Sequence, residues 1–170
     1  MNTKMAGGTF ATNTGLLTAT GAETFFDTTV AIDYCVKGRA GRKAATTDGA
    51  SPTTDANTGD AFTALAASQG CWFVWCLQLD GTVKVAQGEI RNLVADGTND
   101  NDADFEHDNA IPPYPTVPAD CCPFAIQLVK NAEDGSAWIF GTDDWNQTGL
   151  NDLIEDILTM PDRIIDLTTA

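Results

Sequence analysis

One stretch of this 170-residue sequence contains enough closely spaced acidic residues to be considered as a metal-binding site. Calcium takes about six to eight oxygen ligands in irregular geometry, so an acidic loop of this kind could bind it. The EF-hand pattern is not met, because Gly97 directly follows the first aspartate. We therefore interpret the stretch as a solvated surface loop and expect no metal or other cofactor. Its acidic residues are Asp96, Asp100, Asp102, Asp104, Glu106 and Asp108.

The residues that could catalyse a reaction are few. A Ser–His–Asp or Cys–His unit would need His107, the only histidine, which lies in the acidic loop with no apolar segment beside it. The sequence has no GxSxG motif, phosphate loop or dinucleotide fingerprint. Carboxylate pairs that could hydrolyse glycosides are Asp143 with Asp144, and Asp152 with Glu155 and Asp156. Acidic residues are so frequent here that such pairs arise by chance, and we expect no enzymatic activity.

The five cysteines do not predict a disulfide framework, because their number is odd and no secretory signal precedes them. Cys71 and Cys76 fall on opposite faces of a predicted strand, which makes a bond between them implausible. No CxxC pair is present, so a structural zinc site lacks its usual ligands. We expect buried free thiols at Cys35, Cys71, Cys76, Cys121 and Cys122.

Charge separates one short segment from the rest of the chain. The net charge is −15 and the pI is near 4.1, which disfavours nucleic acid and anionic membranes as direct partners. No apolar stretch is long enough for a membrane span. Four of the nine basic residues form a cluster, which is either a docking patch for an acidic partner or a local offset of the chain's own carboxylates. This basic cluster consists of Lys37, Arg39, Arg42 and Lys43.

A tryptophan-rich hairpin dominates the elements that must position these residues. Between Gly70 and Gly88, two apolar runs flank Asp80-Gly81, a pair typical of a type I′ turn. The first run has large side chains on both faces, so both faces need cover from the same chain or from another copy. Four tryptophans could line a glycan site, but core or interface positions are more usual: Trp72, Trp75, Trp138 and Trp145.

The remaining pattern predicts an all-β protein. Residues 1–24 contain few large apolar side chains, which predicts an extended N-terminal arm. A single domain is expected over residues 25–170. Short strands with many turn residues favour a β-sandwich or barrel, jelly-roll-like in form. The expected strands are 28–36, Cys121–Val129 and Ala137–Phe140, and a proline-rich crossing covers 111–118. Apolar spacing over 150–158 predicts at most one short C-terminal helix.

Several ordered motifs resemble a known family. Ile32–Ala40 (IDYCVKGRA) resembles a segment of small structural proteins from tailed phages, and the agreement spans about residues 25–163. The acidic insert near 96–108 is longer than is usual in those proteins. The other matching segments are Ser51–Phe62, Trp72–Trp75, Asp80–Gly88, Cys122–Phe124, Trp138–Thr142 and Met160–Arg163.

The resemblance implies a non-enzymatic capsid cement or decoration protein, made in the bacterial cytoplasm and placed on the outer surface of the virion. It would form a homotrimer and bind the major capsid protein, with the basic cluster facing the capsid. The core and the trimer contact would involve Trp72, Phe73, Trp75 and Leu77. The alternative is a head or tail fibre module that binds a host-surface glycan through an exposed tryptophan.

Overall fold

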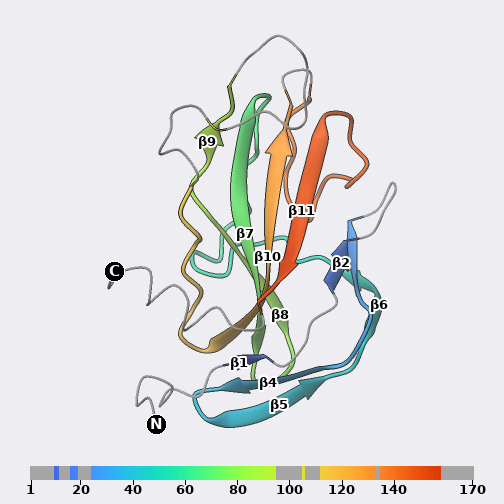
Figure 1. Ribbon diagram of the computed structural model, residues 1–170, viewed down its shortest axis with the longest axis vertical. Helices are drawn as coiled ribbons and strands as arrows, with labels where there is room; N and C mark the ends of the chain where they lie inside the picture. Colours follow the sequence, from blue (N-terminus) through green and yellow to red (C-terminus); the bar gives the residue numbers. More distant parts are fainter. Residues whose placement is uncertain are drawn as a thin grey trace.

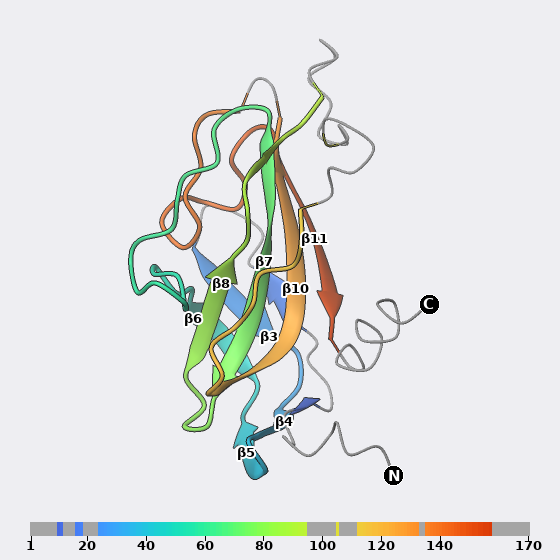
Figure 2. The same cartoon turned by 90° about the vertical axis from the view of Figure 1, so that its left-hand side faces the viewer.

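The computed structural model describes residues 10–11, 16–18, 24–94, 105, 112–132 and 135–157. These residues form antiparallel strands and no helix, which confirms the expected all-β class. The strands lie in three sheets around one main core, an arrangement consistent with a β-sandwich (Figures 1 and 2).

The largest sheet has five strands in the order β11-β10-β7-β8, with the short β9 also paired to β7. Its two long central strands, β7 and β10, run side by side along the vertical axis in Figure 1. The predicted tryptophan hairpin is confirmed as β7 and β8. The five strands are β7 (Gln69–Gln78), β8 (Val83–Gln87), β9 (Arg91–Asn92), β10 (Cys121–Asn131) and β11 (Leu150–Asp156).

A bent ribbon of four strands packs against one face of this sheet. β3 (Phe25–Thr28) and β4 (Ile32–Val36) run outward, and β5 (Arg39–Lys43) and β6 (Thr46–Ala50) return beside them. The single strand expected over 28–36 is therefore two strands, β3 and β4. The β4–β5 hairpin lies across one end of the molecule (Figure 1).

Parts of the segment expected to be an extended arm belong to this ribbon. β1 (Phe10–Ala11) pairs with β4, and β2 (Leu16–Thr18) pairs with β3. β1 thereby joins β4 and β5 in one three-stranded sheet, and β2 joins β3 and β6 in another. The remaining residues of the predicted arm, apart from Thr24, lie outside the described residues.

The main core fills the space between the ribbon and the five-stranded sheet. Phe73 and Trp75 of β7 are fully buried there, and Trp75 packs on Phe26 of β3 with ring centroids 5.2 Å apart. Phe140 lies at the centre of the aromatic group, 4.6 Å from Phe73 and 5.4 Å from Trp75. Further aromatic side chains come from loops that close the core: Phe62, Trp138 and Trp145.

The opposite face of β7 is covered by the same chain. Trp72 and Val74 form a second buried cluster with Ile126 of β10 and Ile157, which follows β11. The proline-rich crossing adds Tyr114, whose ring lies 4.9 Å from that of Trp72. The doubly apolar strand therefore needs no second copy to bury its side chains.

The turn of the tryptophan hairpin differs from the prediction. Asp80-Gly81 was expected to form a type I′ turn, but only Gly81 has a positive φ, of 86°. The Gly81 N–H donates to the Gln78 carbonyl, and the Gln78 N–H donates to the Thr82 carbonyl, both at 2.9 Å. A type I turn followed by a left-handed glycine gives this three-residue loop. Asp80 strengthens it by accepting the Thr82 N–H at 2.9 Å.

The C-terminal prediction was wrong, because the segment expected to be a helix is the edge strand β11. All seven of its residues pair with β10, from Leu150 opposite Asn131 to Asp156 opposite Ala125. The strand expected at Ala137–Phe140 is also absent; Trp138 makes only an isolated bridge to Leu65 there. In both segments, packing against distant parts of the chain outweighs the local pattern.

Candidate functional site

The basic cluster lies on the β4–β5 hairpin. Lys37 and Gly38 form its two-residue turn with φ values of 50° and 79°. Positive φ at both turn residues is the type I′ geometry that matches the twist of paired strands. The turn leaves Lys37 and Arg39 exposed at the end of the molecule (Figure 1).

Both interpretations of the basic cluster find some support in the contacts. Arg42 forms an ion pair with Asp33 on the neighbouring strand, at 3.2 Å between Arg42 Nη1 and Asp33 Oδ1. That pair offsets a local carboxylate, and its exposure makes it weak. Lys43 is half-buried, whereas Lys37 and Arg39 are exposed. These two are the basic side chains best placed to meet another surface.

A hollow of about 350 Å³ separates this basic turn from the tryptophan hairpin. Asp80 and Asp120 line the hollow across from Lys37 and Arg39. Backbone and side-chain hydrogen bonds with Thr82 lower the pKa of Asp80, so its charge persists beside the basic turn. The site therefore combines cations and anions rather than presenting a single sign of charge.

Tyr34 joins the two sides of the hollow. Its hydroxyl lies 2.9 Å from the carbonyl oxygen of Gln78 and 3.1 Å from that of Leu79. Burial, with a smaller contribution from Asp80, raises the pKa of Tyr34 and keeps the hydroxyl a donor at neutral pH. This contact fixes the ribbon against the β7–β8 turn.

The four side chains predicted for the core and the trimer contact are all buried within one chain. Phe73, Trp75 and Leu77 are inaccessible and belong to the main core, and Trp72 belongs to the second cluster. Their predicted contact between copies stays a prediction. Any such contact would be made by exposed neighbours, such as Tyr114 and Leu153, which are 41% and 53% exposed.

A polar group lies inside the core beside Trp75. The indole Nε1 donates to Gln127 Oε1 at 2.9 Å, and Gln127 Nε2 donates to Asp152 Oδ2 at 2.9 Å. Gln127 is fully buried, so each of these bonds satisfies a group that burial would otherwise penalise. Asp152, a candidate for hydrolysis in the sequence, thus supports the core from its rim.

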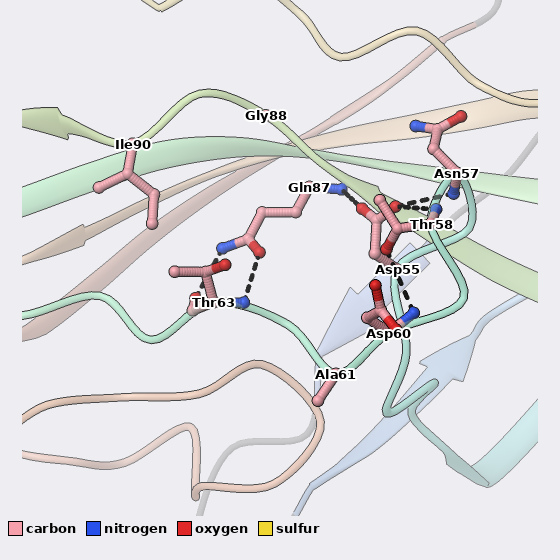
Figure 3. Close-up of a pocket in the computed structure, with 9 residues that line it drawn as sticks. All are labelled: Asp55, Asn57, Thr58, Asp60, Ala61, Thr63, Gln87, Gly88 and Ile90. Atoms are coloured by element: carbon pink, nitrogen blue, oxygen red, sulfur yellow. Dashed lines mark hydrogen bonds between the residues drawn. The ribbon is translucent and has the colours of Figure 1, made fainter.

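A second hollow, of about 470 Å³, lies beside β8 (Figure 3). Asp55 Oδ1 accepts the backbone N–H groups of Asn57 and Thr58, and Oδ2 accepts that of Gln87 at 2.6 Å. The side-chain amide of Gln87 bonds both backbone groups of Thr63 at 2.8 Å. The polar groups drawn in Figure 3 thereby fasten the loop of residues 51–63 along the outer edge of β8.

The other residues singled out for chemistry are dispersed. Asp143 Oδ2 accepts the Ile139 N–H at 2.7 Å, which shapes a loop over the core. The acidic stretch 96–108, including His107, lies outside the described residues except for Phe105. Among the residues that the structure describes, no three His, Cys, Asp or Glu side chains are grouped to hold a metal ion. The same residues contain no helix long and apolar enough to cross a membrane.

All five cysteines are buried as free thiols, as expected. Burial raises the pKa of Cys71 to about 12 and that of Cys122 to about 11. Cys121 of β10 lies opposite Gln78, two residues along β7 from Cys76, so Cys76 and Cys121 share one face of the sheet. The sequence did not reveal this neighbourhood, because it depends on the register between β7 and β10.

No family model, curated protein or solved structure was found to match this chain.

Proposed function

We propose that this protein is a non-enzymatic capsid cement protein of a tailed bacteriophage, which binds the outer surface of the head as a homotrimer. The observation that carries the proposal is the convergence of the phage-like motifs. Phe62, Phe73, Trp75, Trp138 and Phe140 come from three separate motifs and pack in one core. Matching segments that build a common core are expected when a resemblance reflects a shared fold.

The proposed mechanism is mechanical. A trimer seated over neighbouring capsid subunits buries interface in the assembled shell but not in its dissociated parts. By mass action, such binding stabilises the shell against the pressure of packaged DNA. The net charge of −15 suits a protein present in many copies, because it favours solubility and keeps decorated particles apart.

The exposed turn of the β4–β5 hairpin is the proposed contact with the major capsid protein. Lys37 and Arg39 present positive charge on an otherwise acidic chain, which would steer the protein to an acidic capsid surface and set its orientation. The turn lies at one end of the molecule, so it can approach the shell without rearrangement of the core (Figure 1).

The glycan-binding alternative receives less support. Sugar recognition by tryptophan needs an exposed indole face. None of Trp72, Trp75, Trp138 and Trp145 is more than 8% exposed.

Binding to empty phage heads tests the proposal. We expect the wild-type protein to co-sediment with expanded heads and to raise the temperature at which filled heads release DNA. The double variant Lys37→Glu, Arg39→Glu should bind at least about tenfold more weakly, since each reversal replaces attraction by repulsion. The control Arg91→Glu, Lys130→Glu makes the same charge change on the five-stranded sheet and should retain binding.

Absence of wild-type binding to heads would overturn the proposed function. Equal binding by the two double variants would instead remove the β4–β5 turn from the contact while leaving the cement function standing.

A further inference from the structure

The hollow between the basic turn and the tryptophan hairpin has two walls of opposite charge. Lys37 and Arg39 form its basic wall, and Asp80 and Asp120 form its acidic wall. All four residues are exposed, and the hollow between them measures about 350 Å³. A partner surface of a single charge sign would therefore be attracted by one wall and repelled by the other.

Apolar side chains also line this hollow. Val36 is buried and Leu79 is half-buried, and both belong to or pack on the main core. The hollow can therefore contact carbon as well as charge. A polypeptide segment offers both, whereas a free ion offers charge alone.

Hydrogen bonds hold the two walls in place before any partner arrives. The Tyr34 hydroxyl donates to the Gln78 carbonyl at 2.9 Å, which ties the strand before the basic turn to the tryptophan hairpin. Gln78 Nε2 donates to Asp120 Oδ2 at 3.0 Å, and Asp80 Oδ1 accepts the Thr82 N–H at 2.9 Å. A carboxylate has about four acceptor positions, so both aspartates can still bind a ligand. A site formed in advance loses less conformational entropy on binding.

We propose that this hollow binds an exposed segment of the major capsid protein that carries an acidic and a basic side chain close together. The inference rests on the proposed capsid function and adds the chemistry of the partner. The acidic side chain of the segment pairs with the basic wall, and its basic side chain pairs with the acidic wall. The carbon between them lies on the apolar lining.

A mixed-charge segment and a purely acidic capsid surface predict opposite effects for one change. If the partner presented only acidic groups, neutralising the acidic wall would remove repulsion and strengthen binding. If the partner presents both charges, the same change removes an attraction and weakens binding. The direction of the effect therefore identifies the chemistry of the partner.

Co-sedimentation with expanded empty phage heads measures this direction. The variant Asp80→Asn, Asp120→Asn removes both charges of the acidic wall, and the asparagine oxygens can accept the same two hydrogen bonds. We expect its Kd for heads to be at least about tenfold larger than that of the wild type. The control Glu89→Gln, Asp144→Asn makes the same change in net charge at two exposed residues outside the hollow, and should bind as the wild type does.

The single variants Asp80→Asn and Asp120→Asn should each weaken binding by a smaller factor, and they decide the outcome if the double variant fails to fold. A folded acidic-wall variant that binds as tightly as the wild type, or more tightly, would overturn the mixed-charge segment and leave the cement function standing. An equal loss in the control would also overturn it, because the effect would then follow net charge alone. Absence of wild-type binding would instead overturn the cement function, and this inference with it.

Discussion

At the scale of single residues, the cysteines illustrate how one side-chain type takes different properties from its surroundings. Cys71 faces the aromatic core, where the loss of hydration disfavours its thiolate and raises its pKa to about 12. Cys121 sits at the start of β10 beside a charged turn, where a hydrogen bond from Cys76 lowers its pKa. Burial alone therefore does not determine how a thiol behaves.

The raised pKa of Cys71 predicts a loss of stability in alkaline solution. In the unfolded chain the thiol ionises near its ordinary value of 9.0, whereas in the folded protein it stays neutral to about 12. Its contribution is fully present below pH 9 and is lost as pH rises toward 12, at roughly 1.4 kcal/mol per pH unit. Cys122 and Tyr34, whose pKa values are also raised, add losses of the same sign.

Urea unfolding at pH 8 to 11 under reductant measures this effect. Cys71→Ala should lower the free energy of unfolding at pH 8 but give a flatter pH dependence than the wild type. Val74→Ala removes buried carbon from the same strand without removing an ionisable group, so its curve should stay parallel to that of the wild type. A Cys71→Ala curve that is also parallel would contradict the assignment.

At the scale of elements, two glycines with similar backbone conformations show the difference between backbone strain and steric collision. Gly38 and Gly141 have φ values of 79° and 68°. A Cβ at Gly38 would meet nothing within 4 Å, whereas one at Gly141 would collide with the carbonyl oxygen of Pro52. Gly141 therefore allows the loop carrying Trp138 and Phe140 to lie directly against the segment that begins the 51–63 loop.

Alanine substitution should distinguish the two positions. Gly38→Ala should cost about 1 kcal/mol of stability, because only the left-handed backbone is strained. Gly141→Ala should cost about 3 kcal/mol or more, because two backbones must also separate. Thermal or urea denaturation measures both, and equal losses would show that the loops can part without penalty.

The same scale shows how much the sequence could predict. The β7–β8 hairpin was predictable because its turn and its apolar runs are adjacent in the chain. The fate of residues 150–158 was not, because their apolar spacing fits a helix while their hydrogen-bond partner, β10, is remote. In β11, Ile154 packs against the main core while Leu153 points to solvent. The placement of Cys76 and Cys121 on one face of neighbouring strands likewise depends on the β7–β10 register, which no local pattern encodes.

At the scale of the whole molecule, the tryptophans contribute to the fold of one chain rather than to an exposed contact surface. Each is buried by its own chain, so a folded monomer needs no partner to cover them. The candidate contact with the capsid lies instead on the exposed β4–β5 turn. Variants of that turn can therefore alter binding without disturbing the core.

Light scattering coupled to size exclusion measures the assembly state directly. The proposed trimer predicts a mass near three times 18.0 kDa. The variant Lys37→Glu, Arg39→Glu should keep that mass, because the proposed contact of the basic turn is with the capsid rather than with a neighbouring copy. A mass of one chain at all concentrations would contradict the trimer and leave a monomeric decoration protein.

The separation of β7 and β10 along the chain has a consequence for synthesis. β7 ends at residue 78, and its neighbour in the centre of the sheet, β10, begins at residue 121. The ribosome must therefore translate residues 79–120 before β10 can pair with β7. At about 5 to 20 residues per second, this interval lasts roughly 2 to 8 seconds. During this interval, a strand with tryptophan on both faces has only β8 and the two-residue β9 beside it in the sheet. Each nascent chain thus passes through a stage at which an apolar strand face is exposed and can adhere to another nascent chain.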